Sequence, residues 1–391
     1  MADTHNDSGL PLPDLYIKNF RGIRKLSIPR LGRVTLLAGR NGVGKTSVLE
    51  AVEVFAGRAS YLVLRGILSE RDEVSYALDV NRDKLILHEW EAIFYGRDST
   101  RSFRTTLGPK REEDRLSLAS VSLIELIRNQ EGTFGTLASK LPLDSEPYTL
   151  CASFQGNDEI VPALLTGEKD SFEVVSDPMA FERELGFLAR QHDSRRPSPI
   201  KCERIGPGYL RHIQLPKFWG HVALRDDETR VVKALKIVYG EEVDRISVIS
   251  DEASRTTLGG QRAIVKLRNH DAPVPLRSLG GGATRLFGLA LALAYCRNGI
   301  LLIDEAENGI HHTAQRDYWR MVLQTAHENN VQVFATTHSW DCVRGFAQAA
   351  VENENVEGVL VRLEKEEKGL RAVRYSEQKL KIAAEQRIEV R

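Results

Sequence analysis

The run from Gly39 to Thr46, Gly-Arg-Asn-Gly-Val-Gly-Lys-Thr, is the feature of this 391-residue chain that most restricts its fold. It matches the pattern G-x-x-x-x-G-K-[ST], a glycine loop that holds phosphates with backbone N–H groups. The apolar residues 34–38 before it predict a buried strand, and residues 47–55 after it predict a helix that ends at Gly57. This order places the loop at a helix N-terminus, which favours bound anions.

The same pattern predicts which side chains contact a bound nucleotide. Lys45 is the flexible cation expected at the β- and γ-phosphates, and the hydroxyl of Thr46 is expected on Mg²⁺. Three further residues of the loop and the first helical turn are expected around the phosphates: Gly42, Gly44 and Ser47. The sequence therefore predicts ATP and Mg²⁺ as cofactors. A chance match in a glycine turn is the alternative, but such a turn requires neither the strand nor the helix.

A second candidate part of the site follows an apolar strand predicted at 299–303. Asp304 and Glu305 come directly after this strand. An acidic pair in this place is typical of a Walker B motif, in which the first carboxylate orients Mg²⁺ and the second polarises the attacking water. Parallel strands bring the loops at their carboxyl ends into one crevice, so we expect both carboxylates near Lys45. Capping of the following helix is an alternative role, and it is compatible with catalysis.

His338 is the third candidate element, and it follows another apolar strand predicted at 331–336. A histidine at this place can contact the γ-phosphate and hold the attacking water in line. A histidine at the end of a strand is also common as a purely structural residue, so that alternative stays open.

A second glycine-rich turn separates this chain from ordinary P-loop enzymes. Gly280, Gly281 and Gly282 lead into a predicted helix, and Ser278 lies just before them. A glycine turn at a helix N-terminus is a second phosphate-binding device, and one nucleotide does not need two. We therefore expect this loop to bind the nucleotide held by another subunit. A tight turn that allows close helix packing is the alternative.

The glycine turn upstream of the acidic pair resembles the signature motif of ABC-type ATPases. The opening run 15–23, Leu-Tyr-Ile-Lys-Asn-Phe-Arg-Gly-Ile, resembles the first hairpin of the SMC, RecF and OLD branch of that group. The runs 302–311 and 334–340 are most similar to OLD-family ATPases and their stand-alone relatives. The resemblance covers residues 13–56 and 245–345.

The resemblance implies an α/β fold: a P-loop ABC-type ATPase head, with a mixed, largely parallel sheet flanked by helices and an inserted α-rich lobe. It implies a flexible tail at 1–12, the N-terminal part of the head at 13–150, a mainly helical inserted lobe at 151–245 and the C-terminal part of the head at 246–391. Residues 58–88 also have a charged, helical pattern.

The resemblance also implies roles for individual residues. Asp304 would hold the metal, Glu305 would be the general base and His338 would be the switch histidine. Asn41 would line the turn of the P-loop. Arg21 would approach the phosphates or the adenine, with a plain surface arginine as the alternative.

Three features depart from the family pattern. The serine of the ABC signature Leu-Ser-Gly-Gly-Gln is replaced by Gly280 and its glutamine by Ala283, and we expect Ser278 to substitute from an earlier position. The Q-loop glutamine has two candidates, Gln130 and Gln155, and neither has a diagnostic setting. The segment after position 339 contains no acidic cluster of the kind that a TOPRIM nuclease domain needs.

Composition limits the classes of partner. The chain has 54 lysines and arginines and 54 aspartates and glutamates, so its net charge is zero. The protein as a whole therefore has no positive electrostatic field that would attract nucleic acid. A local basic patch would still make DNA a possible partner, although a solvated loop is the default. Its candidates are Arg195, Arg196, Lys201 and Arg204. The chain has no apolar stretch long enough to span a membrane and no signal-peptide pattern at its N-terminus. Its four cysteines are far apart and lack metal-binding spacing. These features predict a cytoplasmic protein with no membrane partner.

These features predict an ATP-binding and ATP-hydrolysing head that works as a homodimer or higher oligomer. The resemblance to the OLD family implies a sensor or regulator in prokaryotic defence or DNA surveillance, with a separately encoded effector such as a TOPRIM-type nuclease. A RecF-like DNA-repair ATPase that binds DNA directly is the main alternative. A scaffold that uses ATP only to assemble and an ABC transporter subunit are further alternatives, and the Asp304-Glu305 pair counts against the scaffold.

Overall fold

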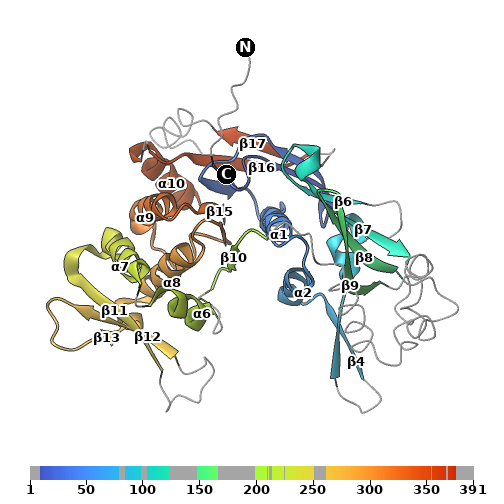
Figure 1. Cartoon of the computed structure of the whole chain (residues 1–391). Coiled ribbons are helices and arrows are strands. Elements are labelled where there is room, and N and C mark those ends of the chain that lie inside the picture. Colours follow the sequence, from blue (N-terminus) through green and yellow to red (C-terminus); the bar gives the residue numbers. More distant parts are fainter. Residues whose placement is uncertain are drawn as a thin grey trace.

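The described part of the chain has a central sheet with helices on both faces and a second sheet beside it (Figure 1). The computed structural model describes residues 9–78, 84–97, 104–122, 148–165, 199–208, 210, 214–223, 225–250, 261–353, 355–366 and 369–375. Among the helices in these ranges, none combines the length and apolar character that a membrane span requires.

The central sheet is parallel except for one antiparallel strand at its edge. Its strands, in order across the sheet, are β10 (Cys202–Ile205), β14 (Ile300–Ile303), β15 (Gln332–Thr337), β3 (Val34–Ala38), β16 (Gly358–Glu366) and the antiparallel β17 (Gly369–Tyr375). Strands β3, β14 and β15 are buried along their whole length, as expected for parallel strands covered on both faces. The largely parallel sheet predicted from the sequence is thus confirmed.

Successive residues of a strand contribute to two different cores on the two faces of this sheet. In β14, Leu301 and Ile303 belong to one core, whereas Ile300 and Leu302 belong to the other. The first core contains the apolar residues of α8, α9 and α10, and the second contains those of α1. These helices are α1 (Lys45–Ala56), α8 (Gly281–Tyr295), α9 (Gln315–Glu328) and α10 (Trp340–Glu352). Helices α1 and α8 therefore pack on opposite faces.

The second sheet is antiparallel, and it packs against α1 through residues such as Phe55 and Phe154, whose rings meet edge to face at 6.3 Å. Its strands, in order, are β2 (Ile23–Ile28), β1 (Leu15–Phe20), β6 (Thr105–Gly108), β7 (Leu116–Ser122), β8 (Tyr148–Phe154) and β9 (Asn157–Leu165). Strands β1 and β2 confirm the expected opening hairpin.

The remaining elements lie at the two sides of the molecule in Figure 1. On the side of α8 they are α6 (Gln214–Val222), α7 (Asp226–Tyr239), β11 (Val243–Ser250), β12 (Gln261–Leu267), β13 (Val274–Pro275) and the 3₁₀ turn η6 (Leu276–Leu279). On the side of α1 they are α2 (Tyr61–Glu70), β4 (Val74–Leu78) and β5 (Lys84–His88).

Two predictions about segments need correction. The helical pattern predicted at 58–88 holds for α2 only, because 74–78 and 84–88 pair as an antiparallel hairpin. The domain boundary predicted after residue 150 falls inside β8, which pairs with β7 on one side and β9 on the other.

Strand β10 also lies within the lobe predicted at 151–245, but it pairs with β14 in the central sheet. The described residues of this segment thus include strands as well as α6 and α7. The mainly helical character of the lobe stays a prediction, since residues 166–198 lie outside the described ranges.

Candidate functional site

The loop at 39–44 joins β3 to α1 and has the backbone of a phosphate-binding turn. Gly39, Gly42 and Gly44 have positive φ angles of 154°, 74° and 107°. A Cβ atom at Gly39 would lie 2.9 Å from the carbonyl oxygen of Leu363, so a larger residue does not fit there. Gly44 is the N-cap of α1, so the amino end of the helix opens into the loop and favours an anion.

Lys45, at the start of α1, is folded back on this loop. Its Nζ donates to the carbonyl oxygens of Gly39 at 2.7 Å and Arg40 at 3.0 Å. Burial lowers the pKa of Lys45, while the carboxylates of Glu307, Asp304 and Glu305, in that order of strength, act to raise it. The ammonium therefore lies among the carboxylates that follow β14, as the sequence predicts.

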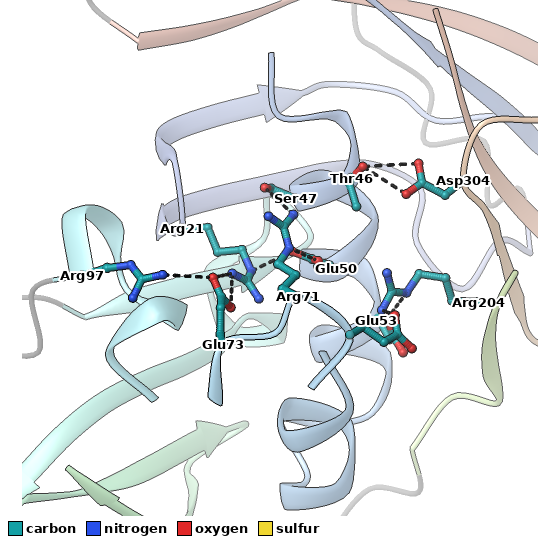
Figure 2. Close-up of polar contacts among 11 residues, drawn as sticks. Arg21, Thr46, Ser47, Glu50, Glu53, Arg71, Glu73, Arg97, Arg204 and Asp304 are labelled. Carbon is teal, nitrogen blue, oxygen red and sulfur yellow. Dashed lines mark hydrogen bonds and ion pairs between the residues drawn. The ribbon is translucent and has the colours of Figure 1, made fainter. Parts of the chain in front are cut away.

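Thr46 and Asp304 meet at the carboxyl ends of the strands (Figure 2). The Thr46 hydroxyl donates to Asp304 Oδ2 at 3.0 Å and to Oδ1 at 3.3 Å. Thr336, at the end of β15, donates to Oδ1 of the same carboxylate and accepts from the backbone N–H of Glu305 at 2.9 Å. Sequence reasoning missed Thr336, although its place two residues before His338 was the available signal.

Glu305 has a left-handed backbone, with φ of 48°. This conformation is uncommon for a residue with a side chain and costs about 1–3 kcal/mol where it persists. Hydrogen bonds on both sides hold it, from Glu305 N to Thr336 Oγ1 and from Asn308 N to the Glu305 carbonyl oxygen. The side chain remains partly exposed. A strained residue held in this way at the predicted position of the base is typical of a functional site.

His338 contacts the carboxylate of Glu307, for which the sequence predicts no role. Its Nδ1 lies 3.1 Å from Oε1 of Glu307, and its backbone N–H donates to the same oxygen at 2.9 Å. The His338 side chain is 44% exposed, and that of Glu307 is 13% exposed. Sequence reasoning missed Glu307, although a third carboxylate two residues after Glu305 was visible in the sequence.

The second glycine turn forms the start of α8, as predicted. Gly280 is the N-cap, with φ of 98°, and Ser278, Gly280 and Gly281 are exposed. Gly282 is closely packed, because a Cβ atom there would lie 3.2 Å from the carbonyl oxygen of Gly309. The helix that follows this turn packs on the opposite face of the sheet from α1, while the turn itself contacts the loop after β14 at Gly309.

Arg285 connects α8 to the acidic loop. Its guanidinium is buried and donates to the carbonyl oxygens of Gly206 at 2.6 Å, Gly208 at 2.5 Å and Asp304 at 3.3 Å. Burial lowers the pKa of Arg285. The glycine-turn helix is thus fixed to the backbone of the residue that contacts Thr46.

Arg21 is a buried member of an ion-pair network, so the surface alternative is wrong. Its Nε lies 2.7 Å from Glu50 on α1, and its Nη1 lies 2.8 Å from Glu73. Arg71 contacts Glu50 at 2.6 Å, and Arg97 contacts Glu73 at 3.4 Å (Figure 2). Three arginines and Glu73, from three different segments of the chain, are thereby joined to Glu50 of the P-loop helix.

This network forms part of the wall of a cavity of about 700 Å³ beside the P-loop. The lining also includes Gly42, Gly44 and Ser47 of the P-loop and the first turn of α1. Its volume lies within the usual range for small-molecule sites, about 300–1,000 Å³. Asn41 is exposed at the tip of the loop, and Ser47 is buried in the first turn of α1, 3.5 Å from Nη2 of Arg71.

The other residues considered from sequence do not join the site. Arg204 is buried against Glu53 and Glu70, and Lys201 lies 3.8 Å from the ring centre of Tyr295. Gln155 lies in the turn between β8 and β9 and donates to Asp114. Three candidates lie outside the described residues: Gln130, Arg195 and Arg196.

Comparison with known proteins gives a family match over more than half of the chain. The AAA ATPase domain family matches residues 12–126 and 225–343. An ATP/GTP phosphatase of Helicobacter pylori is 21% identical, with 88% of this chain and 89% of the phosphatase aligned. An OLD nuclease of Thermus scotoductus is 23% identical over 84% of this chain and 59% of the nuclease.

An uncharacterized protein of Methanocaldococcus jannaschii, MJECL10, is 34% identical over 85 residues, which are 22% of this chain and 32% of that protein. The aligned region thus spans less than two thirds of MJECL10 and of the OLD nuclease. Among solved structures, the SMC head bound to the C-winged helix domain of ScpA has a TM-score of 0.44 at 12% identity, covering 94% of this chain and 99% of that one.

Proposed function

The chain belongs to the AAA ATPase domain family and is an ATPase, and we propose that the P-loop, Asp304 and Glu305 together form its catalytic site. The observation that carries this proposal is the contact between Thr46 and Asp304, 258 residues apart in sequence and 3.0 Å apart in space. A P-loop hydroxyl beside the first carboxylate after a neighbouring parallel strand is the pair that holds Mg²⁺ in P-loop NTPases.

The donor set fits Mg²⁺, which prefers hard oxygen ligands and takes few of them from the protein. Thr46 and Asp304 would hold the ion, which would neutralise charge on the phosphates. Lys45 would leave the carbonyl oxygens of Gly39 and Arg40 and turn to the β- and γ-phosphates. Glu305 would take a proton from the attacking water, with its backbone held by Thr336.

The cavity beside the P-loop would take the base and ribose. It borders Gly44 and Ser47, where the helix N-terminus receives the phosphates, and it is large enough for a nucleoside. Arg21, Arg71 and Arg97 line it, and Arg21 also pairs with Glu50 and Glu73. Asn41 and Gly42 would border the phosphates at the tip of the loop.

The exposed glycine turn would complete the site of a second copy of the chain. Ser278, Gly280, Gly281 and Gly282 lie at the N-terminus of a 15-residue helix, on the face of the sheet opposite α1. An anion-binding helix end on that face would meet the nucleotide of another subunit, because the P-loop helix of its own chain packs on the other face. Two heads would therefore close on two ATP molecules, with His338 acting as the γ-phosphate switch.

Use of the ATPase cycle in prokaryotic defence or DNA surveillance is supported by similarity to the OLD nuclease only. A separately encoded effector, such as a TOPRIM-type nuclease, would receive the closure signal. Direct DNA binding is the alternative, and salt-dependent binding of a duplex by the purified chain would favour it.

The site is tested by phosphate release from ATP with Mg²⁺ and with excess chelator. We expect Mg²⁺-dependent turnover in the natural protein, loss of turnover in Lys45→Ala, and retention of turnover in Lys25→Ala, a matched exposed lysine on β2. Turnover in Lys45→Ala equal to that of the natural protein would contradict the proposal.

A further inference from the structure

Glu307 is a carboxylate of the acidic loop to which the roles above assign no chemistry. One of its oxygens, Oε1, accepts from the backbone N–H of His338 at 2.9 Å and lies 3.1 Å from Nδ1 of the same residue's ring. Glu307 follows β14 and His338 follows β15, and these strands are hydrogen-bonded neighbours. The pair therefore joins the two loops at the carboxyl end of the sheet.

The surroundings of Glu307 place it inside the proposed site. Its side chain is only 13% exposed, and its second oxygen, Oε2, is buried with no hydrogen-bond partner among the described residues. Burial lowers the pKa of Lys45, and of the three carboxylates that oppose this effect Glu307 contributes most. A buried, half-satisfied carboxylate beside a catalytic lysine is costly, so a purely structural loop contact does not explain it well.

The contact to the ring has a chemical consequence. A carboxylate only accepts hydrogen bonds, so a proton on Nδ1 of His338 would turn this 3.1 Å contact into a hydrogen bond. The ring is then held in one orientation, and its other nitrogen, Nε2, is left for a further contact. The side chain of His338 is 44% exposed, so that nitrogen has access to a ligand in the site.

We infer that Glu307 is a positioning residue: it fixes the ring of His338 and its protonated nitrogen, so that Nε2 meets the γ-phosphate and the attacking water. This inference rests on the proposed ATPase site. It leaves unchanged the proposed role of Glu305 as the general base. Glu305 is thereby left free to act on water, while Glu307 and His338 form a separate pair.

The inference is tested by a double-mutant cycle of Glu307→Ala and His338→Ala, measured by kcat for ATP hydrolysis and by equilibrium ATP binding. Loss of a residue that orients a functional side chain typically costs about 10–100-fold in activity. We expect Glu307→Ala to lower kcat by about 10-fold or more, with the Kd for ATP within about threefold of the natural protein. In the His338→Ala background the same change should lower kcat by less than about twofold, because the ring that it orients is gone.

Two further variants separate positioning from stability. Glu307→Gln keeps an acceptor oxygen and the side-chain shape, so we expect it to recover most of the activity lost in Glu307→Ala and to melt near the natural protein. Glu352→Ala removes a carboxylate from a surface pair between the last residue of α10 and Arg316 on α9, and it should leave kcat unchanged.

Equal losses of kcat from Glu307→Ala with and without His338 would overturn the inference, as would a Glu307→Gln variant that folds but is as inactive as Glu307→Ala. A loss of ATP affinity as large as the loss of kcat would also overturn it. Failure of the proposed function is distinguishable, because the natural protein would then show no hydrolysis that depends on Lys45.

Discussion

Arg21 Nε lies 2.7 Å from Oε2 of Glu50, and the two side chains are 5% and 1% exposed. This pair ties the turn after β1 to the helix that begins at the P-loop. Arg71 contacts the other oxygen of the same carboxylate, so Glu50 holds two arginines at the wall of the cavity beside the P-loop. The proposed nucleotide pocket is thus shaped by a residue of α1 that lies outside the phosphate loop.

We expect Glu50→Ala to destabilise the fold strongly. Removal of one partner of a buried ion pair leaves an uncompensated charge and typically costs about 3–5 kcal/mol. Chemical denaturation followed by circular dichroism measures this loss. Glu352→Ala, which breaks an exposed pair with Arg316, is the matched control and should cost about 0–1 kcal/mol. Equal stabilities of the two variants would show that the buried network contributes no more than a surface pair.

Lys45→Ala should weaken ATP binding severely. The ammonium is the cation proposed for the β- and γ-phosphates. A hydrogen bond to a charged group contributes about 1.5–3 kcal/mol, and the loss of binding free energy is larger where the ammonium contacts two phosphates. Isothermal titration measures the affinity, and Lys25→Ala controls for loss of a lysine. An ATP affinity unchanged in Lys45→Ala would remove the assignment of this loop to the phosphates.

Glu305→Gln should keep ATP bound but nearly stop turnover. The amide preserves the shape and the left-handed backbone of the residue, yet it cannot take a proton from water. General base catalysis typically contributes 10²–10⁴-fold, so we expect a loss of about that size in kcat. Single-turnover hydrolysis measures the chemical step directly. If Glu305→Gln stays within about threefold of the natural protein, another group activates the water.

The P-loop, its strand and its helix could be predicted because the evidence for them is local. Glycines that need positive φ, a buried apolar run and a helical pattern are contiguous in sequence. Thr336 and Glu307 were missed because their contacts depend on the pairing of β14 with β15, which a single sequence does not give. The edge strand β10 was missed for a similar reason: Arg204 within it is polar and is buried only because Glu53 and Glu70 meet it from α1 and α2.

The burial of Arg21 could not be predicted for the same reason, because it depends on contacts between distant parts of the chain. Its neighbours in sequence are compatible with an exposed turn, and the partners that bury it come from α1 and from the segment after α2. Charges that are solvated in isolation become interior residues when long-range ion pairs satisfy them. Patterns of apolar residues predict cores, whereas buried polar networks require knowledge of the fold.

The glycine turn at the start of α8 should act on the nucleotide of a second subunit. Gly281 is exposed and is the first residue of the helix, so it accepts a side chain more easily than Gly280, whose φ is 98°. Gly281→Asp would place a carboxylate against the γ-phosphate of the neighbouring head. We expect ATP binding to a single head to persist, while ATP-dependent dimerisation and hydrolysis are lost. Gly66→Asp, at an exposed helical position on α2 with open space around it, is the matched control and should behave as the natural protein.

Mixing Gly281→Asp with Lys45→Ala subunits tests the action in trans. A dimer of two heads has two composite sites, each made from the P-loop of one subunit and the glycine turn of the other. In the mixed dimer one site carries both changes and the other carries neither, so hydrolysis should return to part of the natural rate although each variant alone is inactive.

A negative result has two explanations. If mixed dimers form and bind ATP but hydrolyse it no faster than either variant alone, then either the turn acts within its own chain or hydrolysis requires both sites of the dimer to be intact. The second case is recognised because a mixed dimer of natural and Gly281→Asp subunits, which also keeps one intact site, would then be inactive as well.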